Sequence, residues 1–155
     1  MITQQFRPSS PDQCSPPGIS ESKGMNPKLE IVVFLTSVKA TLAAMDRAAR
    51  LLKGLNGHIS LVHFPTVPRQ LALDSPPVSL DFTKERLLAI ANESSVDTTA
   101  YLYLCRCPFE GLMSVLKPDA LIIIGCPRRW WPTWETKLAR KLQHAGYQVI
   151  LQKSA

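Results

Sequence analysis

The sequence has little that would mark a membrane or secreted protein. No apolar run approaches the roughly 18 residues that a membrane-spanning helix needs, and the longest runs cover only residues 31–35 and 120–124. The N-terminus has no basic segment followed by an apolar one, the usual pattern of a secretory signal. The four cysteines of a chain without such a signal are expected to stay reduced. We therefore expect a cytoplasmic protein with no membrane span.

Recognisable catalytic motifs are also missing. The chain shows no Ser/His/Asp arrangement, no pair of carboxylates at a catalytic spacing and no Walker loop. His63 comes at the end of an apolar segment, where it is better explained as a strand-end residue than as a catalytic base. We therefore predict no catalytic residues and no enzymatic activity.

The charge is unevenly distributed along the chain. Residues 1–27 carry balanced charges, so the net charge of +6 belongs to the rest, and residues 105–155 hold eight basic side chains against three acidic ones. A basic face can attract nucleic acid or anionic lipid. We favour the simpler interpretation that these side chains lie on outer helix faces and keep the domain in solution, so nucleic-acid binding is not expected.

The composition divides the chain near residue 28. Residues 1–27 contain five prolines, five serines and almost no periodic apolar residues, a composition that cannot bury enough surface to offset the entropy of ordering. We predict a disordered tail over 1–27 and one α/β domain over 28–155. Met25 lies at the end of the predicted tail, so translation starts either there or at Met1.

Apolar segments of strand length alternate with segments of helical periodicity after residue 28. The segment 29–35 is β-branched and apolar almost throughout, which is typical of a strand covered on both faces. The alternation continues to the C-terminus and predicts strands at 29–35, 58–64, 98–107, 120–125 and 147–152, with a helix between successive strands. This pattern predicts an α/β fold, an open five-stranded parallel sheet with helices on both faces.

Two of the cysteines, Cys105 and Cys107, end the third predicted strand. Residues at this spacing share a face but lie about 6.5–7 Å apart along an extended chain, which is long for a disulfide unless the strand bends. His63 would add a third metal ligand, but a fourth is not evident, because Cys126 is expected several strands away. We therefore predict ordinary thiols and no metal site, with redox pairing and a metal site as the alternatives.

The loop after the fourth predicted strand combines a promising position with unsuitable residues. In open α/β sheets, ligands bind past the carboxyl ends of the strands, and phosphate loops there are glycine-rich because backbone N–H groups must approach the anion. The loop 125–134 has one glycine, two prolines without an N–H group and three tryptophans. The position suits a nucleotide site, whereas the residues do not.

Three segments together resemble the universal stress protein family, over about residues 28–153. They are the opening strand 30–35, the apolar strand around a histidine at 59–64, and a C-terminal half that runs from Pro108 through a strand ending at Gly125 and a helix to a last apolar strand. The resemblance implies the fold of the adenine-nucleotide alpha-hydrolase group, with strand order 3-2-1-4-5. It also implies a homodimer through the last strand, whose edge residues here are Tyr147, Val149 and Leu151.

The resemblance also indicates which residues would contact ATP or AMP. ATP-binding members carry an Asp after the first strand, where this chain has Thr36 and Ser37, and Val62 of the second strand is the next candidate contact. Those members also carry Gly-x2-Gly-x9-Gly followed by Ser or Thr. Only the first glycine and the hydroxyl residue are matched here, by Gly125 and Thr136.

Two other positions of that loop carry side chains that change its chemistry. Arg128 stands in place of the second glycine and Glu135 in place of the last. A Cβ is strained where the backbone must approach a ligand closely, and a carboxylate at a helix start repels phosphate. Arg128 and Arg129 could compensate through side-chain contacts, because Arg pairs with phosphate bidentately.

Three tryptophans, Trp130, Trp131 and Trp134, flank the two arginines. Exposed Trp and Arg side chains are common binding anchors, so these residues are candidates for a partner-binding surface. In the alternative interpretation the tryptophans fold back over the strand ends and plug the vacant pocket. Both interpretations predict that no spacious ATP cleft is present.

These observations predict a non-catalytic, stress-related or regulatory module that acts through protein contacts and has weak or lost ATP binding. One alternative is a binder of a nucleotide or another anion through a remodelled loop of Arg128, Arg129 and Thr136. The other is a cryptic nucleotide-dependent enzyme. No cofactor is assigned, and ATP or AMP belongs only to the alternatives.

Overall fold

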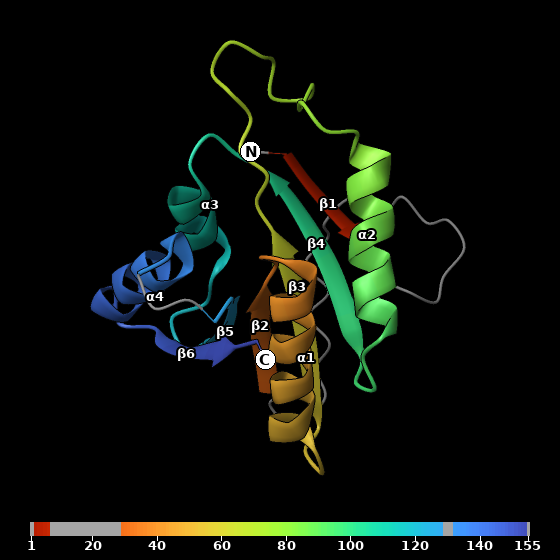
Figure 1. Cartoon of the computed structure of the whole chain (residues 1–155), viewed down its shortest axis with the longest axis vertical. Coiled ribbons are helices and arrows are strands. Elements are labelled where there is room, and N and C mark those ends of the chain that lie inside the picture. The colour runs from red at the N-terminus through yellow and green to blue at the C-terminus, as the bar shows by residue number, and fades with distance from the viewer. Residues whose placement is uncertain (1, 7–28, 129–131, 155) are drawn as a thin grey trace, which may run out of the picture.

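The computed structural model describes residues 2–6, 29–128 and 132–154, which form one sheet and four helices (Figure 1). The strands are β1 (Ile2–Phe6), β2 (Leu29–Phe34), β3 (Gly57–His63), β4 (Thr98–Leu104), β5 (Leu121–Cys126) and β6 (Gln148–Lys153). The helices are α1 (Val38–Leu52), α2 (Leu80–Asn92), α3 (Pro108–Val115) and α4 (Trp134–His144). One helix follows each of the strands β2 to β5, as the alternating pattern predicted.

Five of the strands run parallel, in the spatial order β4-β3-β2-β5-β6. Numbered from the first predicted strand, this is the order 3-2-1-4-5, so the predicted α/β class and strand order are confirmed. The chain builds the sheet outward from β2 on one side and then returns to the other side at β5. The boundary between β2 and β5 is therefore a topological switch point, the usual ligand position in such sheets.

The sheet has one strand more than predicted. Residues Ile2–Phe6, inside the segment predicted as a disordered tail, pair antiparallel with β4 and make the sheet six-stranded and mixed. The prediction of disorder is corrected for these residues, and residues 7–27 of the predicted tail lie outside the described residues. Without β1, β4 would end the sheet with unpaired backbone groups, and a short extended segment can pair with them without a core of its own.

Alternating residues of the parallel strands point to opposite faces, and each face has its own core. The face covered by α1 and α2 buries a cluster that includes Val33 and Leu61, and we call it the α1/α2 face. The face covered by α3 and α4 buries a cluster that includes Phe34 and Ile124, and we call it the α3/α4 face. Figure 1 shows the two helix pairs on the two sides of the sheet. Within the described residues, no helix combines the length and apolar character needed to cross a bilayer.

The third parallel strand is shorter than predicted. β4 ends at Leu104, Cys105 makes an isolated bridge with Thr66, and Cys107 is the N-cap residue of α3. Pro108 follows at the first helical position, where its missing N–H group costs no hydrogen bond. Cys105 and Cys107 therefore belong to the turn between strand and helix.

Candidate functional site at the carboxyl edge

The switch point lies between the carboxyl ends of β2 and β5, where Phe34 pairs in register with Ile124. From here residues 35–37 lead into α1, and residues 127–133 lead into α4, with 129–131 outside the described residues. The structure thus brings the loops that carry the predicted ligand residues to the same edge of the sheet. The question is whether their polar groups are free to bind a ligand.

Thr36 and Ser37, at the position of the family's Asp, make hydrogen bonds within the protein itself. Thr36 Oγ1 donates to the carbonyl of Gly125 at 2.8 Å, which joins the loop after β2 to the end of β5. The N–H of Thr36 donates to Thr41 Oγ1 at 3.0 Å, and that hydroxyl donates to the Ser37 carbonyl at 2.8 Å. The Ser37 side chain caps α1 by accepting from the Ala40 N–H at 3.4 Å. The Thr36–Gly125 hydrogen bond therefore bridges the two sides of the switch point, and the others fix the start of α1.

Gly125 is explained by the packing of α1. A Cβ at this position would lie 2.1 Å from the carbonyl oxygen of Ala40 and 2.4 Å from its carbonyl carbon. Both are backbone atoms in the first turn of α1, so no movement of a flexible side chain could relieve the overlap. The glycine lets α1 approach β5 closely, and no bound phosphate is needed to account for it.

The first turn of α4 contains a buried carboxylate. Glu135 is 5% exposed, and its Oε2 has no hydrogen-bond partner among the described residues. It lies close to the buried thiol of Cys126, whose pKa is raised by burial and further by the charge of Glu135. The N-terminus of a helix attracts one negative charge most strongly in its first turn. In α4 the negative charge in the first turn is that of the Glu135 side chain.

The other candidate residues of this loop are more accessible. Arg128 is exposed, and Thr136 is half-buried with its Oγ1 3.5 Å from Oγ1 of Thr133. Arg129, Trp130 and Trp131 lie outside the described residues. An anion at this end of α4 could therefore meet Arg128 and Thr136, but it would also meet the carboxylate in the same turn.

A row of aromatic rings crosses the α3/α4 face at the carboxyl edge. Phe34 stacks on Phe64 with ring centroids 5.7 Å apart, and Phe64 stacks on Tyr103 at 5.0 Å. Tyr101 extends the row beyond Tyr103, with a centroid distance of 6.1 Å. At the other end Trp134 meets Phe34 edge-on at 5.9 Å and remains 53% exposed. Trp134 thus covers a strand end, as the plug interpretation predicts, and also presents a ring to solvent, as the partner-binding interpretation predicts.

Val62 and His63 point to opposite faces of the sheet. Val62 is 4% exposed and belongs to the core of the α3/α4 face. His63 points to the α1/α2 face, where burial and then the charge of Arg86 in α2 lower its pKa to about 4. The imidazole therefore lies across the sheet from the aromatic row. This placement fits the strand-end role expected for His63.

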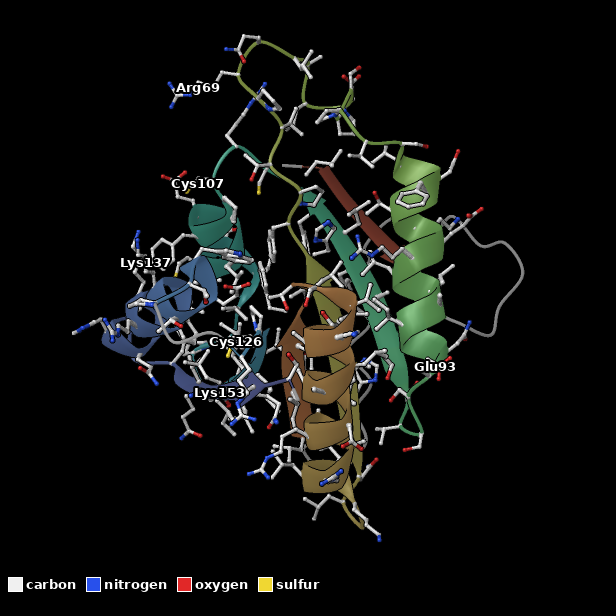
Figure 2. All side chains as sticks on the ribbon, viewed as in Figure 1. Arg69, Glu93, Cys107, Cys126, Lys137 and Lys153 are labelled. Carbon is white, nitrogen blue, oxygen red and sulfur yellow. The ribbon has the colours of Figure 1, made fainter. Side chains whose placement is uncertain are left out.

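The same alternation separates His63 from Cys105, which belongs to the core of the α3/α4 face. A metal site formed by Cys105, Cys107 and His63 would therefore lack His63 as its third ligand. The thiols of Cys105, Cys107 and Cys126 are free, and no group of three or more candidate metal ligands occurs within residues 2–6, 29–128 and 132–154. Cys126 lies at the end of β5 beside Lys153, well apart from Cys107 at the start of α3 (Figure 2).

The basic side chains near the C-terminus lie on the outside of the molecule. Lys137, Arg140 and Lys141 of α4 and Lys153 of β6 are all exposed. Figure 2 labels Lys137 and Lys153. The Nζ of Lys141 lies 5.4 Å from the centre of the Phe109 ring, so its stem also covers apolar surface. Such a distribution is what the solvated-face interpretation predicts.

The predicted dimer edge is an edge of the described sheet. Among the described residues, β6 pairs with β5 alone. Val149 is partly buried against the core of the α3/α4 face, Leu151 is 37% exposed, and Tyr147 immediately precedes the strand. An exposed strand edge with an apolar residue can pair with another strand.

Solved structures of universal stress proteins have the same fold. The chain aligns with a universal stress protein from Archaeoglobus fulgidus with a TM-score of 0.58 at 18% identity, over 81% of this chain and 93% of that one. A protein of the same family from Burkholderia pseudomallei aligns with a TM-score of 0.54 at 17% identity, over 79% and 93% of the two chains. This chain has a universal-stress-protein-like fold. No family model and no curated relative matches its sequence.

Sequence reasoning missed the aromatic row and the burial of Glu135. The row could have been predicted, since Phe34 ends β2, Phe64 directly follows the neighbouring strand β3, and Tyr103 lies on the matching face of β4. Aligning the strand ends would have placed the rings together. The burial of Glu135 has no such signal, because a glutamate in the first turn of a helix is usually exposed and favourable there.

Proposed function

We propose that this chain is a non-catalytic, stress-related or regulatory module with a universal-stress-protein-like fold that acts through protein contacts and binds ATP weakly or not at all. The observation that carries the proposal is the hydrogen bond of Thr36 Oγ1 to the Gly125 carbonyl, together with the contact of Gly125 with Ala40. These contacts use the polar groups of the switch point to hold the fold together. A nucleotide would have to displace them.

The electrostatics of the α4 N-terminus support the same conclusion. A triphosphate at this helix would lie next to the buried carboxylate of Glu135, which already uses the positive end of the helix dipole. Like charges at close range in a site shielded from water repel strongly. Arg128 supplies an opposing positive charge from an exposed position, where solvent and salt screen it.

Calorimetric titration of the full chain with ATP, with and without magnesium, tests the proposal. We expect no saturable binding at micromolar concentrations and no turnover of the nucleotide. Glu135→Gln is the informative variant, since removing the charge while keeping the shape should permit weak binding if the carboxylate is the obstacle. Saturable micromolar binding by the unmodified chain would contradict the proposal.

The same titration separates the alternative functions. The accessible Arg128 and the Thr133–Thr136 hydroxyl pair favour an anion binder as the second candidate. That candidate predicts saturable binding that Arg128→Ala abolishes and Lys137→Ala, an equally exposed change of charge on α4, leaves intact. Conversion of bound ATP to products would instead support the enzyme.

We also propose that the module forms a homodimer through the edge of β6. Leu151 lies on this edge and is 37% exposed, and Leu29 at the start of β2 is 43% exposed. In sedimentation velocity, Leu151→Lys should shift the protein toward monomer, whereas the matched change Leu29→Lys should not. A monomeric parent protein, or equal effects of the two variants, would contradict this assembly.

A further inference from the structure

A cavity of about 260 Å³ lies at the carboxyl end of β4, away from the switch point. The turn into α3 contributes Cys105, Arg106 and Cys107, the helix contributes Glu110, Gly111 and Ser114, and the loop before α2 contributes Leu73. Figure 2 shows Cys107 at the outer end of α3, below that loop. Two cysteines, an arginine and a glutamate are therefore among the residues that line one small, partly open cavity.

Hydrogen bonds hold the loop before α2 over this turn. Arg106 donates through Nη1 to the carbonyls of Val67 and Pro68, and through Nη2 to the carbonyl of Leu71 at 2.9 Å. The Val67 N–H donates to the Cys105 carbonyl at 3.0 Å. Leu73, the residue of this loop that lines the cavity, thus follows a segment that is hydrogen-bonded to the turn.

The two thiols of the cavity differ in accessibility. Cys105 is 6% exposed, and its pKa is raised by burial and further by the neighbouring Cys107. Cys107 is half-buried, and its side chain makes no capping hydrogen bond to α3. A thiol reacts as its thiolate and only where a reagent can reach it. Cys107 is therefore the reactive candidate, and Cys105 is a buried neighbour.

The size of the cavity restricts what it can hold. Pockets for drug-sized ligands and cofactors usually measure about 300–1,000 Å³. At about 260 Å³ this cavity lies below that range, and it suits a group the size of one amino acid. It is too small to enclose a nucleotide.

We propose that Cys107 is a thiol–disulfide exchange site that retains half of a small charged disulfide, of the cystine class, as a mixed disulfide in this cavity. The Cys107 thiolate attacks one sulfur of the incoming disulfide and forms a new S–S bond to it. The original S–S bond breaks, and its other half leaves as a thiolate that takes up a proton. Cys107 is oxidised, the departing half is reduced, and no other oxidant is required.

The charges around the cavity fit a zwitterionic adduct. An amino-acid half-disulfide carries a carboxylate and an ammonium group. The cavity lining includes Arg106, which keeps its positive charge while its Nη atoms bond loop carbonyls, and Glu110. Both ends of the adduct therefore find opposite charge within one small volume.

The test is incubation of the native full chain with cystine, followed by intact mass measurement and peptide mapping. We expect one half-cystine adduct on Cys107, formed at least about tenfold faster than on the same residue in the urea-unfolded chain. Cys107→Ser should abolish it, and Cys105→Ser should keep it. A Cys14→Ser background removes the thiol of the N-terminal segment from the measurement.

A second pair of variants tests the role of the cavity charges. Glu110→Gln should lower the native-state preference for cystine over uncharged bis(hydroxyethyl) disulfide by about two- to threefold. Glu85→Gln, an exposed change of the same kind on α2, should leave that preference unchanged. No adduct, an adduct no faster than in the unfolded chain, or loss of two hydrogens by an internal Cys105–Cys107 disulfide would overturn the proposal.

Discussion

The carboxyl edge of the sheet contains two regions that differ in how their polar groups are used. At the switch point between β2 and β5, Thr36 is hydrogen-bonded to the Gly125 carbonyl, α1 rests on Gly125, and Trp134 covers Phe34. At the end of β4, the turn into α3 leaves a cavity of about 260 Å³ lined by two thiols. The switch point, the usual ligand position of this fold, is thus occupied by contacts within the protein, whereas the turn after β4 borders a cavity.

This difference shows that one sheet edge can use its polar groups for internal hydrogen bonds at one loop and leave a cavity at another. The switch point is created by strand order alone, so it persists in any chain with this topology. Whether it remains a site depends on a few groups at the loop ends. Here Thr36 is hydrogen-bonded to Gly125, while Glu135 is buried with no partner for its Oε2 among the described residues. The comparison predicts that substitutions at the switch point act on stability, and the following experiments test it.

The largest effect is expected for Gly125→Ala. The new Cβ would overlap backbone atoms of Ala40, so α1 or β5 must shift, and we expect a loss of about 3 kcal/mol or more in the free energy of unfolding. Urea denaturation of the purified variant measures this loss. Gly146→Ala is the control, because Gly146 has φ +93° but open space around it, and it should lose only about 1–2 kcal/mol. Equal losses of unfolding free energy in the two variants would show that α1 and β5 have space for a Cβ at position 125.

The next effect concerns His63, which lies between the two regions but faces away from both. Burial, with a further contribution from Arg86, holds its pKa at about 4 in the folded protein, below the ordinary value of 6.5. The unfolded chain therefore binds the proton first as pH falls. Stability should be intact above pH 6.5 and decline by roughly 2–3 kcal/mol as pH falls to about 4.

The variant His63→Gln removes this titration and should flatten the stability profile between pH 6.5 and 4. His144→Gln, on the exposed end of α4, is the matched control and should leave the profile as it is. Denaturant midpoints measured across this pH range give the comparison. An unchanged acid slope in His63→Gln would mean that His63 is not the buried histidine described here.

A smaller effect is expected for Thr36→Val. The substitution removes the hydroxyl that donates to the Gly125 carbonyl and puts no hydrogen-bonding group in its place. The free energy of unfolding should fall by about 1–1.5 kcal/mol, the usual cost of losing a partly buried hydrogen bond. Thr36→Ser keeps the hydroxyl and should recover most of the loss. If Thr36→Val gained ATP binding without losing stability, the Thr36 hydroxyl would block a nucleotide site and would not stabilise the fold.

The smallest effect is expected for Trp134→Ala, measured by the same denaturation. Trp134 is 53% exposed and makes an edge-on contact with Phe34, a geometry worth about 1 kcal/mol. Phe82→Ala is a matched control, since Phe82 is 60% exposed on α2, and such surface changes usually stay within about 0.5 kcal/mol. Indistinguishable losses would remove Trp134 from the aromatic row as a stabilising member.

Much of the fold could be predicted from the sequence because the strands are apolar on both faces. Residues 29–35 and 120–124 leave no polar face, so they fit only the interior of a covered sheet, and helical spacing between them dictates crossover connections. The short strand Ile2–Phe6 escaped prediction because it depends on backbone pairing with β4 and carries no apolar pattern of sufficient length.

The candidate site was predicted only in part, for a related reason. The sequence shows which residues follow the strand ends, and the structure places Thr36, Gly125 and Thr136 near the same edge of the sheet. It does not show what those residues contact. That Thr36 donates to Gly125, or that Glu135 is buried, depends on how closely α1 and α4 approach the strand ends.

By itself, then, the sequence determined the fold class and the shortage of glycine in the loop after β5, because periodicity and composition are local properties of the chain, whereas the strand order came from the resemblance to universal stress proteins. Only the tertiary structure decided that a Thr36–Gly125 hydrogen bond joins the two sides of the switch point and that a cavity lies beside Cys107. Both depend on contacts between segments far apart in the chain, and the distances between such segments are set by packing rather than by any local pattern.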